Sequence, residues 1–396
     1  MQKFGSRAEK PAVVMLKQTI AGSGFLWELA EGLADQVGPV IVYSDSPAPI
    51  RVPNVTAIIG PRYRRESYLS RITSWLRFLA GAAILSMRIP RGALLFIIAQ
   101  PPLLPLLGLF RRALWRQKYI VWVDDIYPDV LVRSGLLSRG SPFLSVLEWG
   151  TSVTLKRAAV VYTLAPRMAE TLKKYIRGRT SKLIVVPTWV DTDRFRPVAK
   201  EENPLARLYG QLNKITVQYS GNFGLTHDLD GVIQAAGQLE KNTRLRFMLI
   251  GAGSSWTAVR EVASRLGNIS VLPWQEPETF KWLLSMADIS IVTQKKGIEG
   301  VSLPSKTFYA MAVGSAILGI SRTPSDLADI IARHRCGINV EPDDVEGLVR
   351  ALDTMQDASV LEEYRRNSRR AAETEFSRKI NLPKVLESVQ KVFSGA

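Results

Sequence analysis

Three glycine-containing loops in the second half of the chain carry the residue types that bind a diphosphate. Such a ligand is held by backbone N–H groups, by the amino end of a helix and by one or two cationic side chains. Each loop follows a short apolar run and precedes a stretch with helical periodicity, and glycine there allows tight turns and close approach of a ligand. The loops are Ser220–Gly224, Ile250–Gly253 and Glu299–Lys306.

The third loop makes the most specific prediction. Pro304 suits the first turn of a helix, with Ser302 or Leu303 just before it. A helix that begins there would direct free N–H groups and the Lys306 ammonium at an anion, with Glu299 nearby for sugar hydroxyls. The first two loops are less specific, because glycines between a strand and a helix often form only a turn.

A group of aspartates in the first half could act on a hydroxyl. Asp124, Asp125 and Asp129 follow the apolar run Tyr119–Val123. A carboxylate at the end of a strand could bind or polarise an acceptor hydroxyl. A helix cap at Asp129 and a buried polar contact at Asp124 are equally good interpretations.

Metal and disulfide chemistry are not expected. The chain has one cysteine, Cys336, and two histidines, His227 and His334. It therefore has neither a disulfide framework nor a Cys/His cluster for zinc. We expect no metal site and no cofactor.

The elements around these residues indicate an α/β fold. Continuous apolar, β-branched runs are typical of strands buried on both faces of a parallel sheet, and their alternation with helical stretches indicates α/β units. We predict two Rossmann-like domains. The expected strands are Val13–Leu16, Val40–Tyr43, Leu94–Ala99, Tyr119–Val123, Ala159–Leu164, Leu183–Val186, Ile215–Tyr219, Leu245–Ile250, Ile269–Leu272, Ile289–Thr293 and Ala316–Ile320.

The two domains are predicted to join after Val186. The segment Pro187–Pro197 has proline at both ends and few helix signals, which suits a linker. We place the first domain at residues 1–197 and the second at residues 198–375.

The excess positive charge lies entirely in the first half. The net charge is +16; residues 1–200 hold 29 Lys and Arg against 13 Asp and Glu, and residues 201–396 hold 23 of each. The first half therefore suits an anionic partner. Anionic lipid and nucleic acid are the two obvious choices, and no recognised nucleic-acid-binding module is present.

Residues 61–120 concentrate this charge, with 11 Lys and Arg interleaved with aromatic residues and one acid, Glu66. The uncharged run Ala93–Phe110 approaches the roughly 20 residues of a membrane span, but prolines and a glycine interrupt it, so we predict a strand, a loop and a short helix. We favour an interfacial membrane surface over a merely solvated basic face. The residues assigned to this surface are Arg62, Arg64, Arg65, Trp75, Arg111, Arg112 and Trp115.

The order of the motifs resembles one known family. Gly-Asn-x-Gly, Ile-Gly-x-Gly, Leu-Pro-Trp and Gln-Lys-Lys-Gly-x-Glu-Gly-Val-x-Leu-Pro-Ser-Lys follow one another as in family-four glycosyltransferases of the GT-B fold. The chain is most similar to the branch that builds bacterial exopolysaccharide and O-antigen repeat units, including colanic-acid fucosyltransferase-like and N-acetylfucosaminyltransferase-like enzymes. The similarity is good from Gly221 to Gly337 and traceable at Gly22–Gly24, Trp122–Asp129 and Pro187–Asp191.

The resemblance implies two domains that face each other across a cleft, with residues 376–396 forming a helix that crosses back to the first domain. It also implies roles by position. Glu299 would contact the transferred sugar, and Thr307 replaces the second glutamate of the family's Glu-x7-Glu motif, so Lys306 would carry more of the phosphate charge. The expected catalytic residues are Asp125, Asp129 and Glu299, and the expected donor-binding residues are Gly22, Gly24, Gly221, Asn222, His227, Gly251, Gly253, Trp274, Glu299, Ser305, Lys306 and Thr307.

The function implied is transfer of a hexose-type sugar, with retention of configuration, from a nucleotide-sugar donor to a polyprenyl-diphosphate-linked glycan. The polar segment Met1–Glu9 lacks the apolar stretch of a secretory signal, so we expect a peripheral protein on the cytoplasmic face of the membrane. A nucleotide-sugar epimerase on the same scaffold and a non-catalytic, membrane-associated nucleotide-binding scaffold are the alternatives. No nucleic-acid partner is expected.

Overall fold

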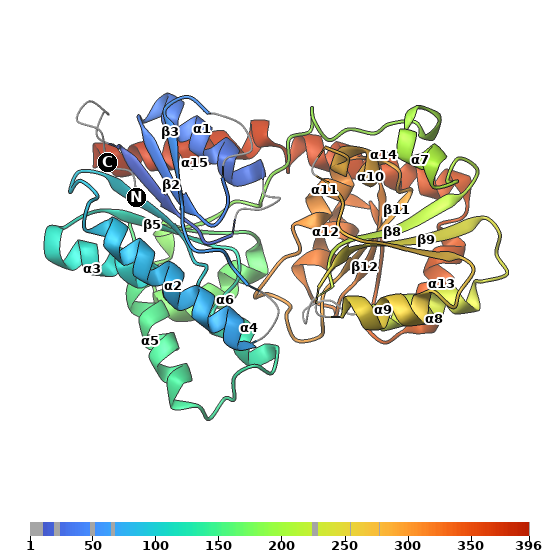
Figure 1. Ribbon diagram of the computed structural model, residues 1–396, viewed down its shortest axis with the longest axis horizontal. Helices are drawn as coiled ribbons and strands as arrows, with labels where there is room; N and C mark the ends of the chain where they lie inside the picture. Colours follow the sequence, from blue (N-terminus) through green and yellow to red (C-terminus); the bar gives the residue numbers. More distant parts are fainter. Residues whose placement is uncertain are drawn as a thin grey trace. The chain divides into compact units, whose positions relative to one another are not determined.

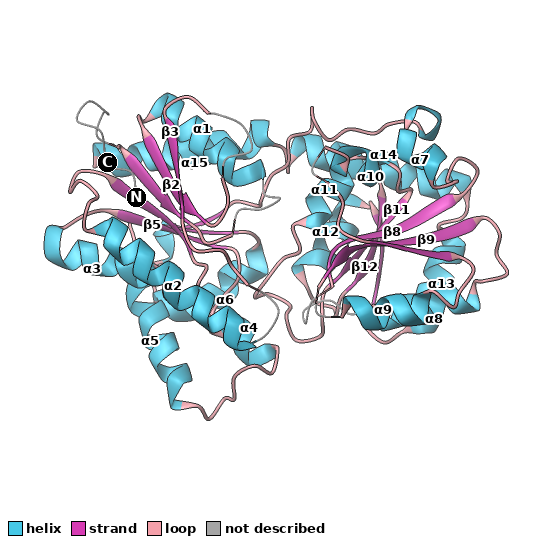
Figure 2. Ribbon diagram, viewed as in Figure 1, coloured by secondary structure: helices cyan, strands magenta, loops and turns pink. Residues whose placement is uncertain are grey.

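The computed structural model describes residues 11–19, 24–47, 52–64, 68–223, 229–253, 255–276 and 278–395. The chain forms two compact units, which we call unit 1 (residues 1–187 and 382–396) and unit 2 (residues 188–381) (Figure 1). Each unit is a parallel sheet with helices packed on it (Figure 2). The predicted α/β class is confirmed.

Unit 1 has a seven-stranded sheet in the order β3-β2-β1-β4-β5-β6-β7. Its strands are β1 (Val13–Leu16), β2 (Val40–Ser44), β3 (Val55–Ile59), β4 (Leu94–Ile98), β5 (Tyr119–Val123), β6 (Val160–Thr163) and β7 (Leu183–Val185). Its helices are α1 (Gly24–Gln36), α2 (Tyr68–Ser86), α3 (Pro105–Trp115), α4 (Asp129–Arg133), α5 (Pro142–Arg157), α6 (Pro166–Ile176) and most of α15 (Arg378–Ser394), with a 3₁₀ turn at Thr180–Lys182.

Unit 2 has a six-stranded sheet in the order β10-β9-β8-β11-β12-β13. Its strands are β8 (Ile215–Asn222), β9 (Leu245–Ala252), β10 (Ile269–Leu272), β11 (Ile289–Thr293), β12 (Ala316–Ile320) and β13 (Gly337–Val340). Its helices are α7 (Pro204–Leu208), α8 (Asp230–Gln238), α9 (Trp256–Ala263), α10 (Phe280–Ser285), α11 (Lys306–Ala312), α12 (Asp326–His334), α13 (Val345–Thr354) and α14 (Ala358–Thr374), with a 3₁₀ turn at Lys200–Glu202.

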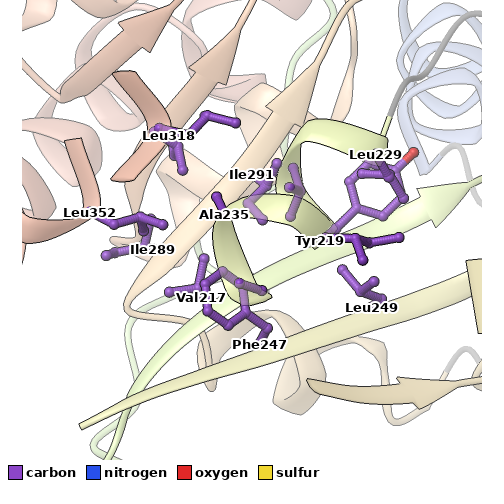
Figure 3. Close-up of a cluster of buried hydrophobic side chains, with 14 of the residues drawn as sticks. Val217, Tyr219, Leu229, Ala235, Phe247, Leu249, Ile289, Ile291, Leu318 and Leu352 are labelled. Atoms are coloured by element: carbon purple, nitrogen blue, oxygen red, sulfur yellow. The ribbon is translucent and has the colours of Figure 1, made fainter. Parts of the chain in front are cut away.

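The core of unit 2 lies between one face of this sheet and the helices α8 and α13. Alternate residues of neighbouring strands point into it, because side chains along a strand alternate between the two faces. Burial of each large apolar side chain contributes about 1.5–3 kcal/mol. Figure 3 shows Val217, Tyr219, Phe247, Leu249, Ile289, Ile291 and Leu318 of the strands, with Ala235 of α8 and Leu352 of α13.

Both sheets reverse their strand order at a corresponding place. In unit 1 the chain returns from β3 at one edge to place β4 beside β1, and in unit 2 it returns from β10 to place β11 beside β8. In open parallel sheets, ligands bind outside the carboxyl ends of the strands at such a switch point. The fold therefore directs attention to the residues that follow β1, β4, β8 and β11.

Every strand predicted from the sequence is present, although some ends differ by one to three residues. The largest difference is at β8, which continues through Gly221 to Asn222. β3 and β13 were not predicted. Both lie at sheet edges and are only partly buried, so their sequences lack the continuous hydrophobicity of central strands.

The division between the units falls after Pro187, whereas the sequence indicated residue 197. The segment that follows packs within unit 2 instead of forming a free linker. Trp189 is fully buried, and Val190 exchanges backbone hydrogen bonds with Phe376 and Arg378. Unit 1 resumes at Leu382, which lies against Gly32 of α1, and not at the predicted residue 376.

The apolar run Ala93–Phe110 forms β4, a loop and the first part of α3, as predicted. Across the described ranges, no helix combines enough length with enough apolar character to cross a membrane.

Arg111 was assigned to the basic surface, and this assignment is wrong. Its side chain is 2% exposed and donates hydrogen bonds to Gln117 Oε1, Ser86 O and Ile89 O at 2.6–2.7 Å. The guanidinium satisfies carbonyl groups at and just after the end of α2, which have no partner within that helix. Arg111 therefore ties α3 to the end of α2.

We expect Arg111→Leu to lower the free energy of unfolding by about 3 kcal/mol or more, because Gln117 Oε1 and the Ile89 carbonyl lose their buried donor and the Ser86 carbonyl keeps only the Ile89 N–H. The adjacent Arg112 is exposed and is the matched control: Arg112→Leu should change stability by less than about 0.5 kcal/mol. Urea unfolding of both variants measures this difference. Equal stabilities of the two would contradict the buried role of Arg111.

Candidate functional site

Lys306 lies at the switch point of unit 2. It is the first residue of α11, and Ser305 is the N-cap, so the helix begins slightly later than the sequence predicted. The Lys306 Nζ lies 3.7 Å from the centre of the Tyr219 ring on β8. A Cβ placed on Gly221 would come within 2.9 Å of the same Nζ, so this glycine leaves room for the ammonium.

The Lys306 ammonium has no hydrogen-bonding partner in the part of the chain that the structure describes, and its Nζ is buried. Burial lowers the pKa of Lys306 to about 7, because a buried amine loses the hydration that favours its charged form. The Tyr219 ring offsets part of this cost through a cation–π contact. An anion placed beside the Nζ would restore the charge.

Two glycines keep the carboxyl ends of β8 and β9 in close contact. Gly221 and Gly251 are paired in register, with φ angles of 149° and 151° that disfavour any side chain. A Cβ on Gly251 would lie 1.8 Å from the Gly221 carbonyl oxygen. The backbone is therefore bare at this edge of the sheet, and donor binding by Gly221, Gly251 and Gly253 stays a prediction.

The side chains of this edge differ in their availability. Tyr219 donates its hydroxyl to the Asn222 carbonyl at 2.7 Å, which fixes the ring beneath Lys306. The half-buried Glu299 accepts from the Gly297 N–H at 2.8 Å. Trp274 is 60% exposed in the loop after β10.

Thr307, which stands where the family's second glutamate would be, makes its hydrogen bond at the start of α11. Its side chain is fully buried, and its hydroxyl donates to the Pro304 carbonyl at 2.7 Å. Thr307 therefore closes the first turn of α11 internally.

The aspartates of unit 1 are largely engaged in structural contacts. Asp129, the first residue of α4, accepts from the Tyr175 hydroxyl at 2.6 Å and pairs with Lys174. Asp124 pairs with Lys17 at 2.6 Å, as one of the interpretations anticipated. Asp125 lines a small pocket with Tyr127.

Lys17 was missed by the sequence reasoning. It follows β1 directly, is 9% exposed, and brings an ammonium to the carboxyl edge of the unit 1 sheet. A single lysine after a fully apolar strand is the signal that could have identified it.

Three predicted residues, Gly22, Arg65 and His227, lie outside the described residues. Gly24 begins α1. No group of three or more His, Cys, Asp or Glu side chains that could hold a metal ion occurs in the described ranges.

The basic surface of unit 1 has different apolar members from those predicted. Arg62, Arg64 and Arg112 are exposed. Trp75 is half-buried with its ring edge-on to Tyr127, and Trp115 lies against Arg111. The exposed apolar side chains belong instead to α2, α3, α5 and neighbouring turns: Leu69, Leu76, Ile84, Met87, Phe110, Leu114, Phe143, Val146 and Trp149.

Comparison with known proteins is consistent with this geometry. The family described as glycosyl transferases group 1 matches residues 214–357, which include the Gly221, Gly251 and Lys306 edge. The chain is 26% identical over 299 residues to the probable glycosyltransferase WbjE of Pseudomonas aeruginosa, covering 74% of each. It is 28% identical over 240 residues to the putative colanic acid biosynthesis glycosyl transferase WcaI of Escherichia coli, covering 59% of this chain and 58% of that protein.

Solved structures share the fold. Sucrose-phosphate synthase from Thermosynechococcus elongatus superposes with a TM-score of 0.77 at 15% identity, covering 98% of this chain and all of that one. WaaG, a glycosyltransferase involved in lipopolysaccharide biosynthesis, gives 0.72 at 16% identity, covering 97% of this chain and all of its own. The chain therefore has the GT-B fold of glycosyltransferases.

The sequence matches bear on the activity, whereas a shared fold alone does not. The glycosyl transferases group 1 match falls within unit 2, and the chain is similar to two proteins described as glycosyltransferases.

Binding of a nucleoside diphosphate should be linked to proton uptake. Near pH 8.5 the free Lys306 is mostly neutral, because its pKa is about 7, and the nucleotide is already ionised. The bound anion raises the pKa, so about one proton should enter per site. The same shift makes stability rise with pH between about 7 and 10.5, because the unfolded chain binds more protons there.

Calorimetric titration with UDP or GDP in two buffers of different ionisation enthalpy measures the uptake. Lys306→Met should remove it. Identical heats in the two buffers for the wild-type protein, despite binding, would show that Lys306 does not meet the phosphates.

Proposed function

We propose that this protein is a retaining glycosyltransferase that moves a hexose-type sugar from a nucleotide-sugar donor to a polyprenyl-diphosphate-linked glycan. Its role would lie in bacterial exopolysaccharide or O-antigen synthesis. The name of WcaI, which refers to colanic acid biosynthesis, supports this setting. A place in the branch with colanic-acid fucosyltransferase-like and N-acetylfucosaminyltransferase-like enzymes is the finer expectation from the motif resemblance.

One observation carries the proposal. A buried ammonium without a hydrogen-bonding partner in the described chain lies at the carboxyl edge of a parallel sheet, beside a glycine-paired strand end. A buried ammonium without a hydrogen bond lowers the stability of the fold, and an anionic ligand beside it would offset this cost. A nucleotide diphosphate has the charge for this position.

The donor is proposed by analogy of fold. The Anabaena protein Alr3699/HepE has been solved in complex with UDP-glucose and superposes with a TM-score of 0.71 at 13% identity. We propose a nucleotide-sugar donor whose diphosphate meets Lys306 and the backbone of Gly221 and Gly251.

The proposed reaction needs stabilisation of the leaving group more than a strong base. The bond between the sugar's anomeric carbon and the β-phosphate oxygen breaks, and the acceptor oxygen bonds to the same carbon. The acceptor proton passes to the leaving diphosphate. In this proposal Lys306 stabilises the charge that develops on the diphosphate, since its ammonium has no hydrogen-bonding partner among the described residues.

The basic surface of unit 1 is the proposed acceptor and membrane side. The exposed Arg62 and Arg64 precede α2, and the exposed apolar side chains of Leu69, Leu76 and Met87 lie on this helix or just after it. This combination suits an interface between anionic headgroups and lipid chains. We propose a peripheral attachment to the cytoplasmic face of the membrane.

We expect Lys306→Ala to lower the rate of sugar transfer by about a hundredfold to a thousandfold, as is typical when a group that stabilises developing charge is removed. Lys241→Ala, at an exposed lysine after α8, is the control and should retain activity. Transfer is measured with radiolabelled donors and membrane extracts, and folding by circular dichroism. Full activity of a folded Lys306→Ala protein would remove the donor site.

Charge reversal at Arg62, Arg64 and Arg65 should weaken binding to vesicles of phosphatidylglycerol at least about tenfold, because each cation near an anionic surface adds to the attraction. Hydrolysis of free donor should be unchanged. The matched control reverses three exposed cations of unit 2, Lys241, Arg260 and Lys296. Equal vesicle binding of both variants would contradict the surface.

A further inference from the structure

A basic pocket lies at the amino ends of β6 and β7, at the opposite edge of the unit 1 sheet from Lys17 and Asp124. Its volume is about 560 Å³. The cationic side chains that line it are Arg112, Lys156, Arg157, Arg179 and Lys182. None of its described lining residues is acidic. Nothing in the proposed transfer reaction uses this edge of the sheet.

The five cations come from three places along the chain and line the same pocket. Arg112 belongs to the last turn of α3, Lys156 and Arg157 to the last turn of α5, and Arg179 and Lys182 lie between α6 and β7. Helix–strand alternation brings these helix ends together, since α3, α5 and α6 each lead into the amino end of a strand (Figure 1).

The Lys182 ammonium forms its hydrogen bonds within the protein. Its Nζ donates to the Lys156 and Ala158 carbonyl oxygens at 2.5 and 3.0 Å, which caps the end of α5. Burial, with smaller contributions from Arg179 and Arg112, lowers the pKa of Lys182 to about 8. The neighbouring guanidinium groups are thus close enough to repel it.

The negative ends of the helix dipoles at this pocket balance only part of its positive charge. The carboxyl end of a helix carries about half a negative charge, so the ends of α3, α5 and α6 supply about one and a half. The pocket holds five cations, which leaves a clear excess. Arg112, Arg157 and Arg179 make no ion pair or side-chain hydrogen bond with any residue that the structure describes.

We propose that this pocket binds an anion with two or more phosphate charges, either a free pyrophosphate group or the phosphates of a lipid headgroup. Guanidinium groups suit such a ligand because they bind phosphate oxygens in pairs of hydrogen bonds. The pocket is a second anion site, independent of Lys306.

Site-specific arginine labelling tests the proposal on the full chain. Phenylglyoxal modifies accessible arginines, and mass spectrometry of the digest reports each position. Pyrophosphate, or vesicles containing cardiolipin, should slow labelling of Arg157 and Arg179 about tenfold or more, while the exposed Arg260 of unit 2 is unaffected. Vesicles of phosphatidylcholine alone should protect neither position.

The two arms separate the sources of the phosphate. Protection by pyrophosphate without protection by cardiolipin vesicles assigns a free ligand, and the reverse assigns a lipid headgroup. Unchanged labelling of Arg157 and Arg179 in both arms overturns the proposal.

Paired variants give an independent measurement. Arg157→Ala/Arg179→Ala should weaken binding of the protective ligand about tenfold or more, whereas the charge-matched Lys241→Ala/Arg260→Ala should not. Donor hydrolysis should be retained by both variants. Equal ligand binding by the two pairs overturns the pocket, whereas loss of hydrolysis in Lys306→Ala alone concerns only the donor site.

Discussion

The carboxyl edge of the unit 2 sheet, where we propose that the donor binds, depends on one contact, the Lys306 ammonium held 3.7 Å above the Tyr219 ring. Tyr219 is fully buried in the core, and its hydroxyl is fixed by the Asn222 carbonyl. The core therefore sets the position of the ring, and the ring sets the position of the cation. Gly221 leaves the space that this arrangement needs. Because the partner of the ammonium is an aromatic face and not a carboxylate, its charge remains available to a ligand.

The sheet of unit 1 reverses its strand order in the same way, but the lysine at its switch point forms an ion pair. Lys17 follows β1, the strand that corresponds to β8, but it pairs with Asp124 at 2.6 Å. The pair compensates its own charge, so Lys17 is not an unpaired cation of the kind that a diphosphate favours. Carboxylates such as Asp125 at the same edge suit hydroxyl groups better. The two sheets share this strand order but differ in the side chains at the switch point, which is why we propose anion binding for unit 2 and not for this edge of unit 1.

The elements that could be predicted from the sequence are those with a continuous hydrophobic pattern. Central strands such as β5 and β11 are apolar along their whole length because both faces are covered, and they were located to the residue. The edge strand β3 is half-covered and has no such pattern. Lys306 was recognised from its position in a motif, but its contact with Tyr219 joins residues 87 positions apart and has no local signature. Neighbouring arginines in one helix, Arg111 and Arg112, have different environments that only packing against α2 decides.

The net charge of unit 1 therefore overestimates the number of cations that are available to an anionic partner. Arg111 satisfies carbonyl groups at the end of α2, Lys182 caps α5, Lys17 pairs with Asp124 and Lys174 pairs with Asp129. The exposed Arg62 and Arg64 and the arginines that line the pocket at the amino ends of β6 and β7 do not take part in these contacts. Cations that already hold the fold together cannot also carry ligand affinity without a cost in stability. Binding is expected to concentrate on those cations, such as Arg157 and Arg179, that the fold does not use.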